Sequence, residues 1–350
     1  MSRTWWAGGT LALALVASAV VALALGPADI TPGDILGSAG HHLATLLHPV
    51  LGGFGLEVPA DPLSRIQDAI VWQGRLPRVV AAIGVGAGLA VTGTVMQALL
   101  RNPLADPYLL GISSGASVGA VAVLVLGVGL LLPVAAFAGA VLALAASLTL
   151  AGVVSGGRLT PGRTVLAGVA VAQACSAVTS FIIFTSVQGD SYREVLGWLM
   201  GTLGGATWRS AVIVWVALAV VGVVLVTSGR TLDAFAFGDT SAASLGVHVA
   251  RTRWTLLGLV ALLVGAMVSV SGSIGFVGLV VPHAVRLLVG ARHVRVLPLA
   301  AVAGALVLLW ADTAARTVIE PRELPVGILT AAIGAPVFAL LLARRRGGIA

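Results

Sequence analysis

The sequence contains no lysine, so all 20 of its basic residues are arginine. A Walker A phosphate-binding loop requires a lysine, and this chain therefore cannot carry the nucleotide-binding motif of a P-loop ATPase. Charged residues are also scarce, at 9% of the chain, against about a quarter in soluble domains. The single cysteine, Cys175, excludes an internal disulfide.

Apolar residues make up 58% of the sequence and recur in runs of about 20 residues, the length that crosses a bilayer. These runs are continuous rather than alternating, which argues against an outer-membrane barrel. We therefore predict an all-α, multi-pass membrane protein. The net charge of +7 does not indicate a nucleic-acid partner, because the arginines stand at the ends of apolar runs, where membrane topology explains them.

Ten membrane-spanning helices are predicted from these runs. The first is longer than the apolar core of a signal peptide, so we interpret it as an uncleaved span. The spans are placed at residues 5–25, 79–100, 109–131, 134–154, 165–186, 210–227, 254–271, 276–289, 299–318 and 326–343.

Arginine distribution predicts the orientation of these spans. With both termini in the cytoplasm, thirteen arginines lie inside and seven outside, while most acidic residues lie outside. The positive-inside rule thus favours an N-in, C-in arrangement. The whole chain, 1–350, is then one transmembrane domain with a long outer loop at 26–72 and a cytoplasmic loop at 228–253.

Two local patterns concern helix packing and capping. Gly111, Gly115 and Gly119 recur every four residues, which would place them on one face of the third span and allow another helix to approach closely. In the cytoplasmic loop, Asp239 or Thr240 is predicted to cap a short helix that ends at Gly246.

Few residues indicate chemistry within the chain. His41, His42 and His48 lie together without cysteine or an adjacent carboxylate, which is a weak metal signal, and we predict no metal site. No catalytic constellation is recognisable, so the chain is not expected to be an enzyme. Asp312 is the one carboxylate inside a span, and Arg316 stands four residues later. An intrahelical ion pair is the simpler interpretation, and a proton-coupling carboxylate is the alternative.

Arginines on the predicted outer face run against the positive-inside rule. Arg75 and Arg78 stand three residues apart in "WQGRLPR", and Arg316 faces the same compartment. They are either anchors that extend to the membrane surface or a docking site for an acidic soluble partner.

Several segments together resemble the FecCD-type permeases of bacterial ABC importers, which take up ferric siderophores, haem and cobalamin. The resemblance extends from about Arg75 to Leu342. It rests on "GRLPR", "GTVMQALLRNPLADPYLLGISSGASVG", "AFGDTSAASLG", "GSIGFVGLVVPHAVRLLVG" and "ELPVGILTAAIGAPVFALLL".

This resemblance implies a type II ABC importer permease fold in the bacterial cytoplasmic membrane. The implied partners are a second permease subunit, two cytoplasmic ATPase subunits and an extracytoplasmic binding protein. ATP and Mg²⁺ would then be bound by the ATPase subunits, and no cofactor by this chain.

The resemblance also assigns roles to residues of this sequence. Binding-protein docking falls on Arg75, Arg78 and Arg316. Contact with the ATPase falls on Phe237, Gly238, Asp239, Leu245 and Gly246. The cytoplasmic gate falls on Asn102 and Leu104 and, between the fourth and fifth spans, on Thr160, Pro161 and Gly162, where the family's adjacent hydroxyl residues are replaced.

A ferric siderophore is the substrate that we expect from the sequence, with haem or cobalamin as alternatives. From another class of protein, a proton-coupled secondary transporter would require Asp312 to titrate.

Overall fold

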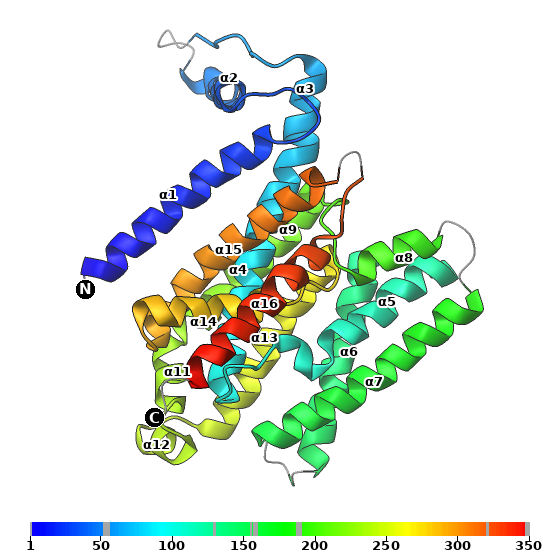
Figure 1. Cartoon of the computed structure of the whole chain (residues 1–350), viewed down its shortest axis with the longest axis vertical. Helices are drawn as coiled ribbons and strands as arrows, with labels where there is room; N and C mark the ends of the chain where they lie inside the picture. Colours follow the sequence, from blue (N-terminus) through cyan, green and yellow to red (C-terminus); the bar gives the residue numbers. More distant parts are fainter. Residues whose placement is uncertain are drawn as a thin grey trace.

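The computed structural model describes residues 2–51, 57–128, 131–154, 156, 160–186, 191–319 and 322–346, and every regular element in this part of the chain is helical (Figure 1). The elements are α1 (Ser2–Ala24), α2 (Pro32–Leu51), α3 (Arg65–Ala69), η2 (Ile70–Arg75), α4 (Leu76–Leu99), η3 (Pro107–Leu110), α5 (Ile112–Leu126), α6 (Leu132–Val154), α7 (Pro161–Ser186), α8 (Ser191–Leu199), α9 (Trp208–Ala217), η4 (Leu218–Gly222), α10 (Val223–Thr227), α11 (Gly229–Phe235), α12 (Asp239–Ser244), α13 (Val249–Ser271), α14 (Val277–Val289), α15 (His293–Thr317) and α16 (Val326–Arg346).

Each predicted span coincides with an apolar helix. Six helices are long and apolar enough to cross a membrane: 65–99, 132–154, 162–186, 208–227, 249–271 and 293–317. Four shorter apolar helices, at 8–24, 112–126, 277–289 and 326–341, account for the other predicted spans. The predicted start differs most at the second span, where the continuous helix begins at Arg65 rather than Val79. At the third span, α5 is shorter than predicted at both ends, from Ile112 to Leu126. Gly111 and Gly127, both with positive φ, stand at its two ends.

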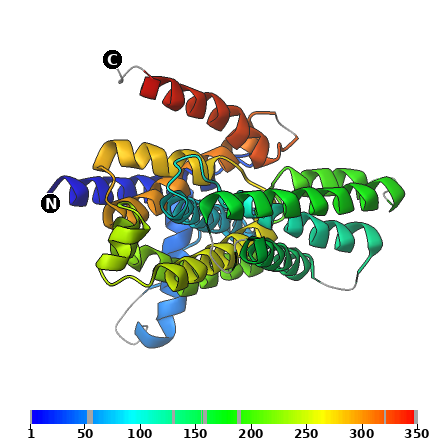
Figure 2. The same cartoon turned by 90° about the horizontal axis from the view of Figure 1, so that it is seen from below.

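Helices α4 and α15 pack against each other at the centre of the molecule, and α13 and α14 flank them. Small residues permit this approach, since a Cβ at Gly86 would collide with the carbonyl of Gly304 and one at Gly304 would collide with the carbonyl of Gly86. Helices α5, α6 and α7 form a second group beside this core (Figure 1). Helix α16 stands apart from the other helices and contacts chiefly α14 and α15 (Figure 2).

The three glycines of the third span behave differently from one another. A Cβ at Gly115 would meet the backbone of Gly139 on α6, and one at Gly119 would meet the carbonyl of Ala135. Gly111 is not part of this stripe, so its predicted place on the helix face is wrong. It precedes α5 with a φ of 76°, a conformation that glycine adopts without strain.

The two long connections lie at opposite ends of the molecule, with α2 and α3 at one end and α11 and α12 at the other (Figure 1). The connection at 26–72 is more ordered than expected, because α2 alone has 20 residues. Its last part is the start of a continuous helix from Arg65 to Leu99. Ser64 begins this helix with a capping box, in which its hydroxyl and the Gln67 side chain bond reciprocally with the backbone.

Candidate functional site

The three arginines predicted to dock a partner lie close together near the end of the molecule that carries α2. Arg75 belongs to η2, Arg78 to the first turn of α4 and Arg316 to the last turn of α15. Each is less than 9% exposed in this single chain. Buried guanidinium groups need partners, and all three obtain them from the chain itself.

Arg78 is the centre of a buried ion-pair network. Its Nε donates to Asp312 Oδ2 at 2.8 Å and its Nη2 donates to Asp312 Oδ1 at 3.0 Å, which is the bidentate geometry that favours arginine. Its Nη1 donates to Glu323 Oε2 at 2.7 Å. The Asp312 side chain is 2% exposed and that of Glu323 is 51% exposed, so the network runs from the core to the surface.

This network corrects the predicted pairing of Asp312 with Arg316. Helix α4 brings Arg78 to the carboxylate from 234 positions away in the sequence, and the direct hydrogen bonds come from Arg78. Arg316 instead donates from Nη2 to the carbonyl of Ala22.

Arg75 and Arg316 both hold the end of α1. Arg75 Nη1 donates to the carbonyls of Leu23 at 2.7 Å and Ala24 at 3.1 Å, next to the Ala22 carbonyl that Arg316 contacts. The last carbonyls of a helix lack intrahelical donors, and a cation there also complements the helix dipole. The predicted docking arginines thus already secure α1 and the core of this single chain.

The predicted coupling segment, residues 237–246, carries exposed side chains, in contrast to the buried arginines. Phe237 is 78% exposed and Leu245 is 68% exposed, on either side of the short helix α12. Gly238 occupies the N-cap position with a φ of 95° and a ψ of 167°, a combination that is essentially restricted to glycine. The expected cap by Asp239 or Thr240 is therefore wrong. Gly246, with a φ of 84°, follows the C-cap residue Leu245 as predicted.

The Asp239 carboxylate is occupied by an ion pair instead of a cap. Arg253 of α13 donates to it from Nη2 at 2.8 Å and from Nη1 at 3.2 Å. The hydrogen bond from Arg253, helped by the charges of Arg253 and Arg101, lowers the pKa of Asp239 below its ordinary value against a smaller effect of burial. The Arg253 guanidinium also lies 5.5 Å from the ring centroid of Phe235. These contacts fix α12 to the base of α13.

The predicted gate residues lie on two turns. Asn102 Oδ1 accepts the backbone N–H of Leu104 at 2.9 Å in the turn after α4, and Leu104 is 42% exposed. Thr160 and Gly162 are exposed at the start of α7, where the carbonyl of Thr160 accepts the N–H of Thr164 at 3.0 Å. Pro161 is the first residue of α7, a favourable place for proline.

A junction between η3, the start of α5 and the link from α13 to α14 was not predicted. The Tyr108 hydroxyl in η3 donates to the carbonyl of Ile274 at 3.0 Å, and the Ser113 hydroxyl on α5 bonds that of Ser273 at 2.8 Å. Residues 272–276 separate α13 from α14. The signal for this junction was the shortness of the eighth predicted span, residues 276–289, since short helices leave backbone to be satisfied by side chains at membrane depth.

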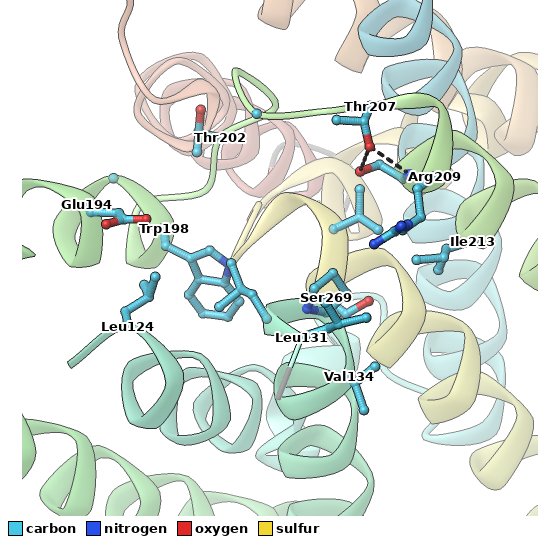
Figure 3. Close-up of a pocket in the computed structure, with 16 residues that line it drawn as sticks. Leu124, Leu131, Val134, Glu194, Trp198, Thr202, Thr207, Arg209, Ile213 and Ser269 are labelled. Carbon is cyan, nitrogen blue, oxygen red and sulfur yellow. Dashed lines mark hydrogen bonds between the residues drawn. The ribbon is translucent and has the colours of Figure 1, made fainter. Parts of the chain in front are cut away.

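Two cavities lie near the two ends of the bundle. The first holds about 530 Å³ between α8, α9 and the ends of α5, α6 and α13. Figure 3 shows Glu194 and Trp198 of α8 on one side of it and Thr207 and Arg209 on the other. The second holds about 400 Å³ and is lined by polar groups that include Gln97, Arg101 and Arg286. Helix α8, which builds the first cavity, was also absent from the predicted spans.

Comparison with known proteins identifies the family of this chain. The sequence profile of the FecCD transport family matches residues 13–344. The vitamin B12 import system permease protein BtuC of Vibrio cholerae is 42% identical over 287 residues, covering 82% of this chain and 86% of that protein. The ABC transporter permease protein YvrB of Bacillus subtilis, described as uncharacterized, is 43% identical over 304 residues, covering 85% of this chain and 84% of that protein.

A solved structure is similar along almost the whole chain. It is an inward-facing conformation of a transporter described as of the metal-chelate ABC type, with 31% sequence identity and a TM-score of 0.79. The match covers 96% of this chain and 98% of the other.

Proposed function

We propose that this chain, which belongs to the FecCD transport family and is the permease subunit of an ABC importer in the bacterial inner membrane, carries a corrinoid of the cobalamin class. The observation that supports this substrate is the 42% identity to a vitamin B12 permease over more than four fifths of both chains. The chain is not itself the ATPase, in agreement with the absence of lysine from its sequence.

The relatives favour cobalamin over the ferric siderophore expected from the sequence. Cobalamin is also a metal chelate, so a corrinoid substrate is compatible with the similarity to a transporter of the metal-chelate type. Siderophores and haem stay as competitors in the test below. Membership of an ABC importer family decides against the proton-coupled transporter, and the direct pairing of Asp312 with Arg78 gives that carboxylate a structural role.

For the topology, we propose the ten-span, N-in and C-in form of the type II importer, with 1–350 as one domain. Support comes from the ten apolar helices and from the placement of the two long connections at opposite ends (Figure 1). The α2–α3 end, here the outer end, would then face outward, and the α11–α12 end, here the inner end, would face the cytoplasm.

A second permease subunit is proposed to complete the translocation path. A cavity of about 530 Å³ suits a ligand of drug size, whereas a corrin with its nucleotide loop is considerably larger. Helices α7 and α16 also leave large apolar side chains uncovered, including Phe184 at 90%, Leu166 at 70% and Leu340 at 65% exposure. These faces are suited to a partner helix or to lipid.

The remaining partners follow from the importer class. Two ATPase subunits would contact α12 through the exposed side chains of Phe237 and Leu245, and the Asp239–Arg253 pair would transmit their movement to α13. A binding protein would dock at Arg75, Arg78 and Arg316. The turns at Asn102–Leu104 and Thr160–Gly162 would close the path on the cytoplasmic side.

Uptake in whole cells tests the substrate assignment. The chain would be expressed with its cognate ATPase and binding protein, in a bacterial host that lacks its own cobalamin, haem and siderophore permeases. We expect saturable accumulation of radiolabelled cyanocobalamin that stops when the ATPase carries an inactivating substitution. Accumulation of a ferric siderophore or haem, without cyanocobalamin uptake, would overturn the assignment.

A further inference from the structure

One imidazole and two carboxylates converge in the segment that precedes α4. His42 of α2, Asp61 of the connection before α3, and Asp68 of α3 each offer a ligand atom, and these atoms lie within 4.8 Å of one another. His42 Nε2 is 2.7 Å from Asp68 Oδ1 and 3.9 Å from Asp61 Oδ2. Three separate segments therefore bring one nitrogen and two oxygen ligands to a single point.

Neighbouring groups fix the ligands from outside the cluster. Asp61 Oδ1 accepts the backbone N–H of Leu63 at 3.0 Å, and the Ser38 hydroxyl lies 3.4 Å from Asp61 Oδ2. Trp72 donates from Nε1 to Ser38 at 3.0 Å, and its ring packs edge-on against His42 with centroids 4.6 Å apart. Outer groups of this kind orient the ligands of metal ions.

We propose that His42, Asp61 and Asp68 bind a divalent transition-metal ion, with Zn²⁺ as the first ion to test. A nitrogen with two carboxylates suits Zn²⁺ and the neighbouring transition metals better than Mg²⁺ or Ca²⁺, which prefer oxygen alone. Asp61 Oδ2 is beyond hydrogen-bonding distance of the imidazole, and a shared cation would offset the repulsion between the two carboxylates.

Metal binding requires the three ligand atoms to come to similar separations. Metal–ligand bonds of about 2.0–2.2 Å place neighbouring ligand atoms roughly 3 Å apart, so the 2.7 Å contact would widen slightly and the 3.9 Å contact would shorten by less than about 1 Å. The two carboxylate oxygens, which lie within 4.8 Å of each other, would also have to approach. The side chains of His42, Asp61 and Asp68 are 40%, 19% and 31% exposed. An ion can therefore enter from solvent and retain a water ligand.

Binding here would fasten α2 to the helix that continues into α4. Asp68 lies only seven residues before Arg75 and ten before Arg78 on the continuous helix 65–99. The competing explanation is a metal-free hydrogen bond between His42 and Asp68, in which Asp61 has no part. Substitution of Asp61 separates these explanations.

The test measures metal binding directly and requires no transport partner. The full-length permease would be purified in detergent, stripped with a chelator and dialysed against Zn²⁺, with bound metal quantified by mass spectrometry. We expect about one ion per chain, with affinity at least about ten-fold weaker in His42→Ala and in Asp61→Asn. The matched control is His41→Ala, because His41 bonds the carbonyl of Pro59 at 2.7 Å and is not a member of the cluster.

Two readouts distinguish ligand loss from misfolding. Zn²⁺ should raise the thermal unfolding midpoint of the unmodified chain and of His41→Ala but not of His42→Ala. X-ray absorption at the zinc edge should show a single imidazole and otherwise oxygen ligands. The proposal is overturned if Asp61→Asn and His42→Ala bind Zn²⁺ as tightly as the unmodified chain, if His41→Ala weakens binding equally, or if the spectrum shows several imidazoles.

Discussion

The two ends of this permease present their candidate partner-binding residues in opposite ways. Arg75, Arg78 and Arg316 are buried and hold carboxylates or helix carbonyls of their own chain. At the other end, Phe237 and Leu245 project into solvent beside α12. An ATPase could therefore contact the coupling segment as it stands, whereas a binding protein could reach the outer arginines only by replacing bonds that already exist.

The two docking events would therefore differ in their free-energy cost. At the inner end, covering exposed apolar side chains is favourable in itself. At the outer end, each ion pair formed with an acidic group of a binding protein must be stronger than the ion pair or carbonyl contact that it replaces. Docking would therefore be linked to rearrangement of the outer end. The predictions below test this comparison.

The largest effect is expected from Arg78→Ala, which leaves Asp312 buried without its bidentate partner. Breaking a buried ion pair on one side costs about 3–5 kcal/mol, so we expect this variant to lose stability of that order in thermal or denaturant unfolding. The double variant Arg78→Ala/Asp312→Asn should recover part of the loss, because it removes the unpaired charge. Equal stability of Arg78→Ala and the unmodified chain would show that the network is not structural.

Features that depend on residues near one another in the sequence could be predicted, and contacts between distant segments could not. Hydropathy acts over whole segments, and it predicted all ten apolar helices. The four-residue spacing of Gly115 and Gly119 predicted their close approach to a neighbouring helix. Pairings across the fold could not be predicted. Arg316 was the nearest arginine to Asp312 in sequence, but the packing of α4 on α15 brings Arg78 into contact instead.

The same limit applies to sites built from short stretches. His42, Asp61 and Asp68 are separated by 19 and 7 residues, and only the approach of α2 to α3 in the folded chain brings them together. At the coupling segment, Asp239 is of a residue type that often caps helices. In the structure, however, its carboxylate is paired with Arg253, and Gly238 occupies the N-cap position.

At the inner end, Gly238→Ala tests whether the position of α12 matters. A side chain at this φ and ψ costs about 1–3 kcal/mol, which should displace Phe237 relative to α12. In the reconstituted importer, we expect at least about a five-fold fall in substrate moved per ATP hydrolysed, with ATP hydrolysis retained. Gly127→Asn is the control, because Gly127 lies outside the coupling segment and has the left-handed conformation at the C-cap of α5, which asparagine tolerates. Unchanged coupling in Gly238→Ala would argue against this role.

At the outer end, a smaller effect is expected from Glu323→Gln. Glu323 is half exposed, so its ion pair with Arg78 contributes up to about 1 kcal/mol. Removing its charge should free Arg78 Nη1 and tighten binding of the binding protein by roughly two- to five-fold, as measured by surface plasmon resonance on permease in nanodiscs. Glu194→Gln, on α8 away from the arginines, is the control. Weaker binding in Glu323→Gln would mean that Glu323 positions Arg78 for docking rather than competing for it.

A dependence of stability on pH is expected from Asp106, in the turn between α4 and α5. Its carboxylate accepts the N–H of Tyr108 at 2.8 Å, yet burial raises its pKa from 3.8 to about 6. Because the folded state holds this proton more tightly than the unfolded state, stability should be greatest below about pH 4, decline as the pH rises toward 6 and then level off. Asparagine mimics the protonated acid, so the decline should be smaller in Asp106→Asn.

Asp239, whose pKa is lowered, should have the opposite effect on stability. Its contribution should persist above pH 4 and disappear only in more acidic solution. Unfolding midpoints measured from pH 4 to pH 8 would distinguish the two carboxylates, and an unchanged pH profile in Asp106→Asn would place the titration elsewhere.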